Sequence, residues 1–365
     1  MPIKILHSNR VENLHEHLAR QIREPHPDSS PLEGETILLD NLVLGSWINL
    51  QLALKNSIAA NIRYLQSSDL FWELSRSLVS ENIPLQTPLS KAEMTWRLMA
   101  LLETPDILKN TQLEPVRNYL AVNGADRFTD LKRYQLSASV ADLFDQYLVY
   151  RPGWINEHWD EGKSLPGEGK PASWQFAEGW QRVLWKALSK RKDATAGLQH
   201  RAAIQRQLLV KLADKLDTDC LKFRRLFVFG VTSMPDSQLE TLMLLAQHID
   251  VHLYLFNPCE MEWFGIRTPG QIIRLEQQQD YLEIGNPLLA GQAGQVKDFI
   301  GQVYDKFDPY LERSEIHEET LFEAPEESSL LSSIQQEILD LNYRGEVAQL
   351  AVESGHARPL PDPWR

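Results

Sequence analysis

Short apolar runs alternate with polar turns and amphipathic segments towards both ends of the chain. Such runs are typical of strands buried on both faces of a parallel sheet, and the segments between them have helical spacing. The predicted elements are, in chain order, the strand Ile3–Leu6, the helix Val11–Arg23, the strand Thr36–Leu39, the helix Trp47–Leu54, the strand Leu226–Phe229, the helix Ser237–Ala246 and the strand Val251–Phe256. A strand followed by a helix and a second strand is the βαβ unit of α/β folds.

Between these two regions the pattern changes to helices. Ser90–Glu93 has the spacing of a helix-capping box, and further helices are predicted over Ser137–Tyr150 and Ser173–Ser189. No strand-like alternation interrupts this part of the sequence. We therefore expect an α/β domain with a parallel sheet from residues 1–66 and 212–345, an inserted all-helical domain from residues 67–211, and a tail or linker from residues 346–365.

Beyond Glu260 the sequence predicts mainly helix and loop. The segment Tyr304–Ser329 has many acidic and few basic residues, which predicts a solvated and partly mobile segment. Ser332–Leu341 predicts a helix, because Ile334 and Ile338 repeat at helical spacing.

The composition is that of a globular protein, with 43% hydrophobic and 24% charged residues among 365. The net charge is −13, whereas an isolated nonspecific DNA-binding protein is usually basic. Any DNA contact must therefore come from a local basic face or from a larger assembly. The two cysteines, Cys220 and Cys259, encode neither a disulfide framework nor a zinc site, which is typical of the cytoplasm. No apolar run is long enough to cross a membrane, and no metal site is expected.

The turn after the strand Thr36–Leu39 is where a nucleotide-binding loop would lie. Such a loop needs several glycines, a lysine for the phosphates, and a serine or threonine for Mg²⁺. Here the predicted loop contains one glycine and no lysine, and the residues that mark this degenerate P-loop position are Asp40, Asn41 and Gly45. We therefore expect no nucleotide, no other cofactor and no catalytic residue.

One stretch, Gln181–Lys211, is locally basic, and Trp180 and Trp185 lie near its start. Its bases are Arg182, Lys186, Lys190, Arg191, Lys192, Arg201, Arg206 and Lys211. Basic residues beside aromatic ones suit single-stranded nucleic acid, through phosphate contacts and base stacking. A solvated helix face with core tryptophans gives the same pattern, so both interpretations remain open.

Acidic residues recur on the predicted helix Ser137–Tyr150. Asp142, Asp145 and Gln146 are spaced so that they share one face, and Leu143 belongs to the opposite, apolar face. Paired carboxylates can perform acid–base chemistry, but they are also common on the polar faces of helices. The residues alone leave both alternatives open.

Nine segments match one known family in the same order along the chain. The most specific is Ala141–Pro152, which Trp154 follows. The others are His7–Arg10, Ile58–Ile62, Phe71-Trp72, the positions Met94, Trp96, Leu98-Met99 and Leu101-Leu102 of one segment, Leu184–Leu188, His200–Ala202, Phe256–Cys259 and Gly285–Ala290. Together they resemble the RecC family, the gamma subunit of exodeoxyribonuclease V. Members of this family are much longer, so we expect an N-terminal fragment.

The resemblance implies a fold like the first motor domain of superfamily 1 helicases, with a helical insertion and without helicase chemistry. It implies a noncatalytic subunit of a helicase–nuclease complex that acts in double-strand break repair and recombination. Such a subunit holds a RecB-like motor-nuclease and a RecD-like motor, contacts forked and single-stranded DNA, and contributes to recognition of the Chi sequence. A cytoplasmic location follows.

The Chi-sensing surface of the family corresponds here to Trp72, Asp142, Leu143, Asp145 and Arg201. We expect Trp72 to stack on a base, Arg201 to contact a phosphate or a guanine edge, and the two carboxylates to accept hydrogen bonds from exocyclic amines. Further candidates for this DNA-binding surface are Gln146, Arg182 and Lys186.

At other positions of that surface the sequence departs from the better-known members of the family. The departures, mostly from polar residues, are at Asp40, Leu42, Ser46 and Gln66. They imply recognition of a different sequence, or of none. Two further alternatives stay open: an adaptor that docks partner proteins without touching DNA, and an active ATP-dependent helicase.

Overall fold

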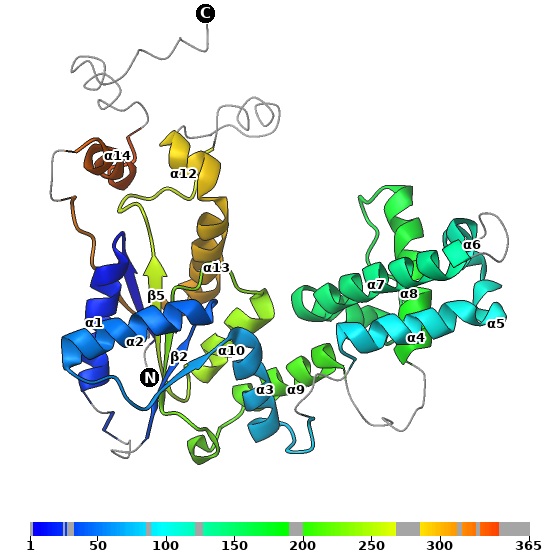
Figure 1. The fold of residues 1–365 in the computed structure, drawn as a ribbon, viewed down its shortest axis with the longest axis horizontal. Helices are drawn as coiled ribbons and strands as arrows, with labels where there is room; N and C mark the ends of the chain where they lie inside the picture. Colours follow the sequence, from blue (N-terminus) through cyan, green and yellow to red (C-terminus); the bar gives the residue numbers. More distant parts are fainter. Residues whose placement is uncertain are drawn as a thin grey trace, which may run out of the picture. The chain divides into compact units, whose positions relative to one another are not determined.

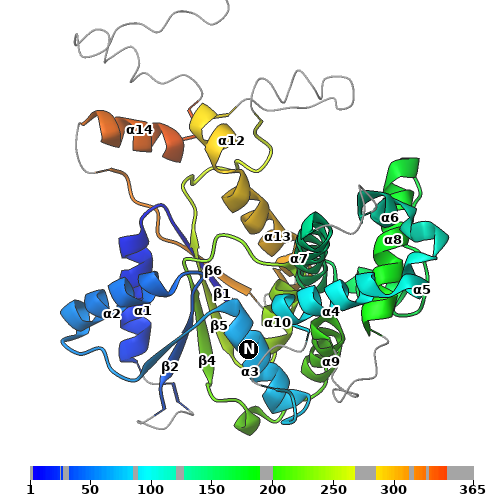
Figure 2. The same cartoon turned by 45° about the vertical axis from the view of Figure 1, so that its right-hand side comes forward.

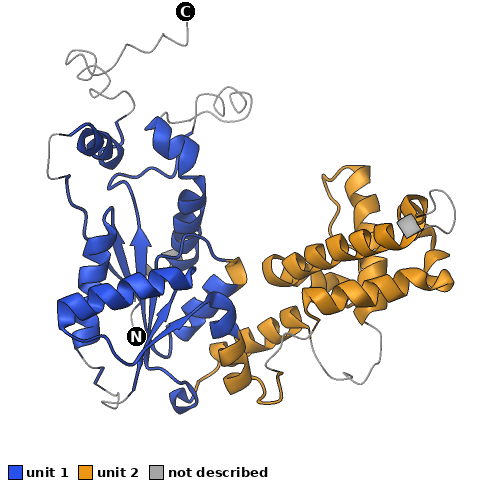
Figure 3. Cartoon of the chain, in the orientation of Figure 1, with its two compact units in different colours: residues 1–71, 217–234, 238–365 blue, residues 72–216, 235–237 orange. Residues whose placement is uncertain are grey.

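The computed structural model describes residues 3–24, 26–27, 33–84, 89–120, 127–189, 200–267, 285–311, 316–325 and 329–342. The chain forms two compact units, which Figure 3 shows in different colours. The sheet unit comprises residues 1–71, 217–234 and 238–365, and the helical unit comprises residues 72–216 and 235–237. The expected tail over residues 346–365 lies outside the described residues.

Six parallel strands build the sheet unit, in the order β3-β2-β4-β5-β1-β6 (Figures 1 and 2). Their bounds are β1 Ile3–Ser8, β2 Glu35–Leu38, β3 Ile62–Leu65, β4 Arg225–Phe229, β5 Asp250–Phe256 and β6 Ile316–Thr320. The α/β class is confirmed. Because β1 pairs with both β5 and β6, segments far apart in the sequence meet in one sheet.

Helices cover both faces of this sheet. The helices α1 (Val11–Arg23) and α2 (Leu42–Asn56) lie on one face, and α10 (Asp236–Leu245) and α13 (Gly294–Leu311) lie on the other (Figure 2). Successive strand residues point to opposite faces, so each strand supplies both cores. The core under α1 and α2 contains Leu6, Leu14, Leu18, Ala19, Ile37, Leu39, Ile48, Leu52, Phe227, Phe229 and Tyr254.

The sequence predicts neither β3 nor β6. All four residues of β3 are half-buried, so its pattern lacks the continuous apolar run that marks the central strands. β6 lies inside the acid-rich segment Tyr304–Ser329. Three of its five residues are exposed, in line with the predicted solvated segment, but the sequence does not predict that this part forms a strand. The strand is polar (Ile-His-Glu-Glu-Thr) because it forms the edge of the sheet, where backbone pairing with β1 holds it with little apolar burial.

The helical unit contains most of the remaining helices. They are α3 (Ser67–Leu78, which begins in the sheet unit), α4 (Lys91–Glu103), α5 (Pro105–Leu108), the 3-10 helix η1 (Thr111–Leu113), α6 (Glu114–Leu120), α7 (Arg127–Tyr150), the π-helix η2 (Trp154–Trp159), α8 (Ala172–Ser189) and α9 (Arg201–Ala213). The predicted helices at α4, α7 and α8 are confirmed, although α7 begins well before Ser137. Ser90 caps α4 as predicted, because its hydroxyl accepts from the Glu93 N–H at 3.3 Å.

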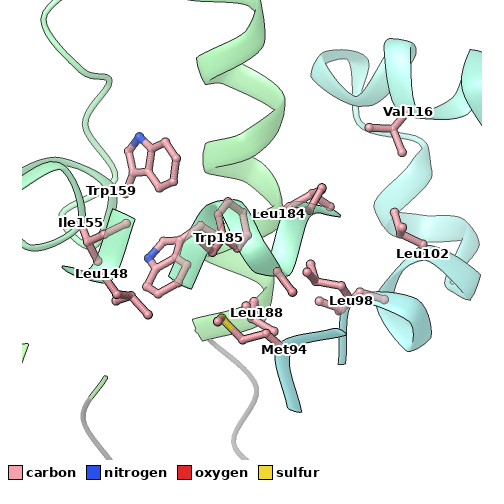
Figure 4. Packing of buried hydrophobic residues seen from close by; sticks show 14 of the residues in the cluster. Met94, Leu98, Leu102, Val116, Leu148, Ile155, Trp159, Leu184, Trp185 and Leu188 are labelled. Carbon is pink, nitrogen blue, oxygen red and sulfur yellow. The ribbon is translucent and has the colours of Figure 1, made fainter. Parts of the chain in front are cut away.

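Large aromatic side chains fill the core of the helical unit (Figure 4). Phe144, Trp159 and Trp185 are fully buried, and the Phe144 ring meets the Trp185 ring edge-on at 5.4 Å between centroids. Rings arranged in this way stabilise a core beyond the burial of their apolar area. This core holds α4, α7, α8 and η2 in place around the polar face of α7.

A smaller cluster packs around Trp263 in the sheet unit, with Cys259, Ile266, Leu289 and Ile300. The elements near it are α12 (Pro287–Gln292) and α14 (Leu330–Leu339), and the 3-10 helix η3 (Thr218–Cys220) precedes β4. The helix predicted over Ser332–Leu341 is thereby confirmed as α14. Among the described residues, no helix combines the length and the hydropathy needed to cross a membrane.

Candidate functional site

The connection from β2 to α2 is much shorter than the predicted loop. Residues 42–46 are helical, so the prediction of a loop over Asp40–Ser46 is wrong and α2 begins at Leu42 rather than at Trp47. The cause is local, because the Asn41 side chain caps the helix by accepting from the Val43 N–H at 2.9 Å. Gly45 is buried inside α2, where a Cβ would lie 3.2 Å from Leu39, so it allows close helix–strand packing.

The Asp40 carboxylate accepts hydrogen bonds from backbone amides at this edge of the sheet. Its Oδ2 accepts a hydrogen bond from the Thr232 N–H at 3.0 Å, and the Ser233 amide also bonds to the carboxylate. Burial raises the pKa of Asp40, and the two backbone hydrogen bonds act in the opposite direction. Gly230 has a φ of +65°, and Leu44 of α2 packs where its Cβ would be. Side chains of the same unit therefore occupy the space beside Gly230 and bond to the amides of Thr232 and Ser233.

The polar face of α7 is the second part of the site. Asp142 forms a short ion pair with Lys91 of α4, and the Gln146 Nε2 donates to Asp142 Oδ2 at 3.0 Å. The hydrogen bond from Lys91 lowers the pKa of Asp142, which is thus held as a carboxylate. Gln146 is exposed, and Leu143 beside it is half-buried. The sequence gives no sign of Lys91, because it lies on another helix.

Arg201, the first residue of α9, lies against Trp72. Its guanidinium carbon is 5.9 Å from the centroid of the Trp72 ring, within cation–π range. Trp72 is only 8% exposed, so its ring supports Arg201 and is not an open surface on which a base could stack. Base stacking on Trp72 stays a prediction, which this buried position does not favour.

Asp145 provides the charge that faces Arg201. Burial lowers the pKa of Arg201, and the negative charge of Asp145 acts against that shift. Conversely, burial raises the pKa of Asp145, and the positive charges of Arg201 and Lys91 act against it. Both groups thus lie in a partly desolvated place where opposite charges interact more strongly than in water.

The residue before Arg201 fixes the start of α9. His200 caps the helix, because its Nδ1 accepts from the Ala203 N–H at 3.1 Å, and its Nε2 lies 2.7 Å from Asp160 Oδ2. The other oxygen of Asp160 accepts from the Trp185 Nε1 at 3.0 Å. Burial would raise the pKa of Asp160, but the hydrogen bonds from His200 and Trp185 outweigh it and the pKa is lowered. The aromatic core thus anchors the backbone that carries Arg201.

The basic residues of α8 belong to a different group. Arg182 donates to buried Glu178 at 3.1 Å and to the carbonyl oxygen of Gly162 at 3.3 Å. Glu178 also accepts from the Trp159 Nε1 at 2.8 Å, so this cluster holds the fold. Lys186 is exposed. The predicted bases Lys190, Arg191 and Lys192 lie outside the described residues.

The structure thus brings five of the eight predicted DNA-binding residues to one region of the helical unit. They come from α3, α7 and the start of α9, and they are Trp72, Asp142, Asp145, Gln146 and Arg201. Leu143 accompanies them on α7. Among the described residues, no group of three or more His, Cys, Asp or Glu side chains is arranged to hold a metal ion.

Comparison with known proteins identifies the family. A family model described as RecC, N-terminal domain, matches residues 3–341. The chain belongs to the RecC family. It is 31% identical to the RecBCD enzyme subunit RecC of Escherichia coli over 98% of its own length, and 31% identical to that of Haemophilus influenzae over 93%. The corresponding subunit of Mycolicibacterium smegmatis is 26% identical over 80%. This RecC-family chain spans about a third of the first two relatives, 33% of each.

One RecC-like segment, His7–Arg10, has a role that the sequence does not show. The Asn9 side chain pairs with the backbone of Glu323 in both directions, donating to its carbonyl at 2.9 Å and accepting from its N–H at 3.0 Å. Ser8 donates to the Leu321 carbonyl at 2.8 Å, and Arg10 pairs with the Glu323 carboxylate at 3.4 Å. In this RecC-family chain the segment therefore fastens the residues that follow β6.

His7 adds further polar contacts with β6. Its Nε2 lies 3.2 Å from the Glu318 carboxylate, and Tyr304 of α13 donates to Glu318 at 2.6 Å. The hydrogen bond with His7 lowers the pKa of Glu318. Polar contacts thus take the place of apolar burial at this edge of the sheet.

Proposed function

We propose that this RecC-family chain is a noncatalytic scaffold and single-strand-sensing subunit of a RecBCD-type helicase–nuclease complex. It acts in double-strand break repair and recombination in the cytoplasm, with RecB-like and RecD-like partners and with forked and single-stranded DNA. The observation that carries the proposal is Arg201, held over Trp72 and beside Asp145 on the helical unit.

The chemistry of this arrangement suits a nucleic acid strand. A guanidinium donates in a planar fork that matches a phosphate or the O6 and N7 atoms of guanine. The Trp72 ring restricts Arg201 before any ligand arrives, so less side-chain entropy is lost on binding. The exposed amide of Gln146 can donate to and accept from a base edge, and Asp142 can accept from an exocyclic amine.

The distribution of charge also supports the proposal. Basic residues slightly outnumber acidic ones in the helical unit, so the net negative charge of the chain resides in the sheet unit. The candidate site therefore belongs to the part of the chain that repels phosphates least.

The short turn between β2 and α2 supports a noncatalytic role and a helicase-like origin of the fold. A parallel sheet with a helical insertion after β3 and α3 fits a motor domain, and β2 with α2 would then stand where the motor binds nucleotide. A three-residue turn, Leu39–Asn41, without lysine offers no cradle for a triphosphate, and the carboxylate of Asp40 already accepts from the Thr232 amide.

The test is crosslinking of a 3′-ended single strand to the chain in the complex reconstituted with its RecB-like and RecD-like partners. Arg201→Ala should lower the crosslinking yield by about tenfold, the loss of one good charged contact. Arg201→Lys should restore only part of it, because a lysine lacks the planar fork.

Lys215→Ala is the control, since Lys215 is an exposed base of the same unit that lies outside the basic stretch Gln181–Lys211. Unchanged crosslinking in Arg201→Ala would favour the adaptor that docks proteins without touching DNA. ATP turnover by the isolated chain would overturn the noncatalytic role.

A further inference from the structure

His200 lies directly before Arg201 and caps the start of α9. Its Nδ1 accepts a hydrogen bond from the Ala203 N–H at 3.1 Å, and its Nε2 lies 2.7 Å from Asp160 Oδ2. Because a backbone N–H can only donate, Nδ1 carries no proton, and the ring proton is on Nε2, where it faces the carboxylate. The two contacts therefore fix His200 as one neutral tautomer.

Asp160 is a carboxylate that is itself held in place. Burial acts to raise its pKa, but hydrogen bonds from His200 and Trp185 outweigh burial and lower it. Trp185, a fully buried ring of the core in Figure 4, donates to Asp160 at 3.0 Å and meets the His200 ring edge-on at 5.5 Å between centroids. Only 11% of the His200 side chain is exposed. The ring therefore cannot turn without losing one of its two hydrogen bonds.

The first turn of α9 carries Arg201, whose position depends on how that turn is held. Asn156 of η2 donates to the Ala202 carbonyl oxygen at 2.9 Å, which ties the turn to the core at a second point. Without its cap the first turn of a helix frays, because its N–H groups have no partner within the helix. Loss of the cap should therefore let Arg201 leave its place beside Asp145 and over the Trp72 ring.

We propose that neutral His200 is the positioning residue of the strand-contacting site: held by Asp160, it caps α9 and keeps Arg201 in the orientation that reaches the strand. His200 acts through Arg201 and needs no contact with DNA of its own. The inference rests on the proposed function, because contact between Arg201 and a single strand is what it explains. It goes further in making that contact depend on the charge of a histidine.

The charge of the ring follows the pH. In the described part of the chain, Asp160 faces the ring from the end of η2, and Arg206 of α9 also acts on Asp160. The neighbour from α8 is the uncharged Trp185. A second proton can add only at Nδ1, where it would point at the Ala203 N–H and break the cap. Since an imidazole gains its charge between about pH 8 and about pH 5, strand contact should weaken as the pH is lowered through this range.

The test is crosslinking of a 3′-ended single strand to the whole chain in the reconstituted complex. His200→Ala should lower the yield by about fivefold, because the cap of α9 is lost. His200→Asn should restore most of it, since an asparagine side chain caps a helix well. In the Arg201→Ala background His200→Ala should have no further effect, because the two residues act as one unit.

Asn110→Ala is the matched control. It removes another side-chain cap of the helical unit, because the Asn110 side chain accepts from the Gln112 N–H at 2.9 Å at the start of η1. The crosslinking yield should stay unchanged, although a cap of similar strength is lost.

The pH profile separates positioning from a purely structural role. Between about pH 7.5 and about pH 6 the yield of the unmodified chain should fall by about twofold more than that of His200→Asn, which has no ring to protonate.

Four results would overturn the inference while Arg201→Ala still lowers the yield and the proposed function stands. They are an unchanged yield in His200→Ala, no recovery in His200→Asn, a further loss when His200→Ala is added to Arg201→Ala, and equal pH profiles of the unmodified chain and His200→Asn. If Arg201→Ala itself leaves the yield unchanged, the inference and the proposed strand contact fail together.

Discussion

The two units of this chain reach stability by different means. The sheet unit depends on ladders between strands far apart in the sequence, such as β1 with β6, and it carries the net negative charge. The helical unit depends on helices near one another in the sequence and on a core of large aromatic rings. The difference teaches that an acidic chain can confine its negative charge to one unit, so that the other unit repels phosphates less, because fixed charges act most strongly close to where they lie.

Trp185→Ala should have the largest effect, because it should destabilise the helical unit and leave the sheet unit folded. Trp185 is fully buried and donates to Asp160, so its loss should cost about 3–5 kcal/mol of unfolding free energy. Because the two units have separate cores, hydrogen exchange should rise throughout α7 and α8 and remain slow in β4 and β5. The exposed Phe176→Ala is the control. Equal loss of protection in both units would show that they unfold together.

Asn9→Ala tests whether side-chain hydrogen bonds hold the edge strand β6 in the sheet unit. The change removes two hydrogen bonds to the Glu323 backbone, so about 1–3 kcal/mol should be lost, and lost locally. Hydrogen exchange should quicken over residues 316–323 and stay unchanged in β4. Asn49→Ala, at an exposed position of α2, serves for comparison. If β6 keeps its protection, the backbone ladder alone holds the strand.

His252→Phe should have the smallest effect of the three changes, on the pH dependence of the free energy of unfolding. Burial lowers the pKa of His252 to about 3, against 6.5 for the free side chain. Between these values the unfolded chain takes up a proton that the folded chain does not. Stability is therefore complete above about pH 6.5 and falls as the pH is lowered.

Urea unfolding near pH 7 and near pH 5.5 measures this dependence. The unmodified chain should lose about 1 kcal/mol more than His252→Phe between the two conditions. Some dependence should remain in the variant, because burial also lowers the pKa of His15 and His17. Identical losses in the two proteins would show that His252 is protonated in the folded state.

Most central elements could be predicted from the sequence, because apolar runs and helical spacing show which of their residues are buried. The apolar runs of β4 and β5 and the helix α1 are of this kind. The edge strand β6 could not be predicted, since its partner lies some three hundred residues earlier and its own residues are polar. Nor could the early start of α2 be predicted, because it depends on a single capping side chain, that of Asn41.

The candidate site shows the same division. The sequence shows that the carboxylates of α7 have helical spacing and that Arg201 belongs to a basic stretch. Their relation to Trp72 and Lys91 is not visible, because these residues lie on other helices. That the units correspond to a helicase-like domain and its insertion remains a prediction.

The sequence by itself determined the α/β class, the change to helices in the middle of the chain, and the family, since each depends on residue order or local periodicity. Only the tertiary structure decided which charged side chains are paired and which aromatic rings are exposed. In the folded chain Trp72 is buried beneath Arg201, and Arg182 pairs with Glu178. Trp96 and Tyr134 face solvent. Exposure and pairing depend on what packs against a side chain from elsewhere in the chain, and no local pattern records that.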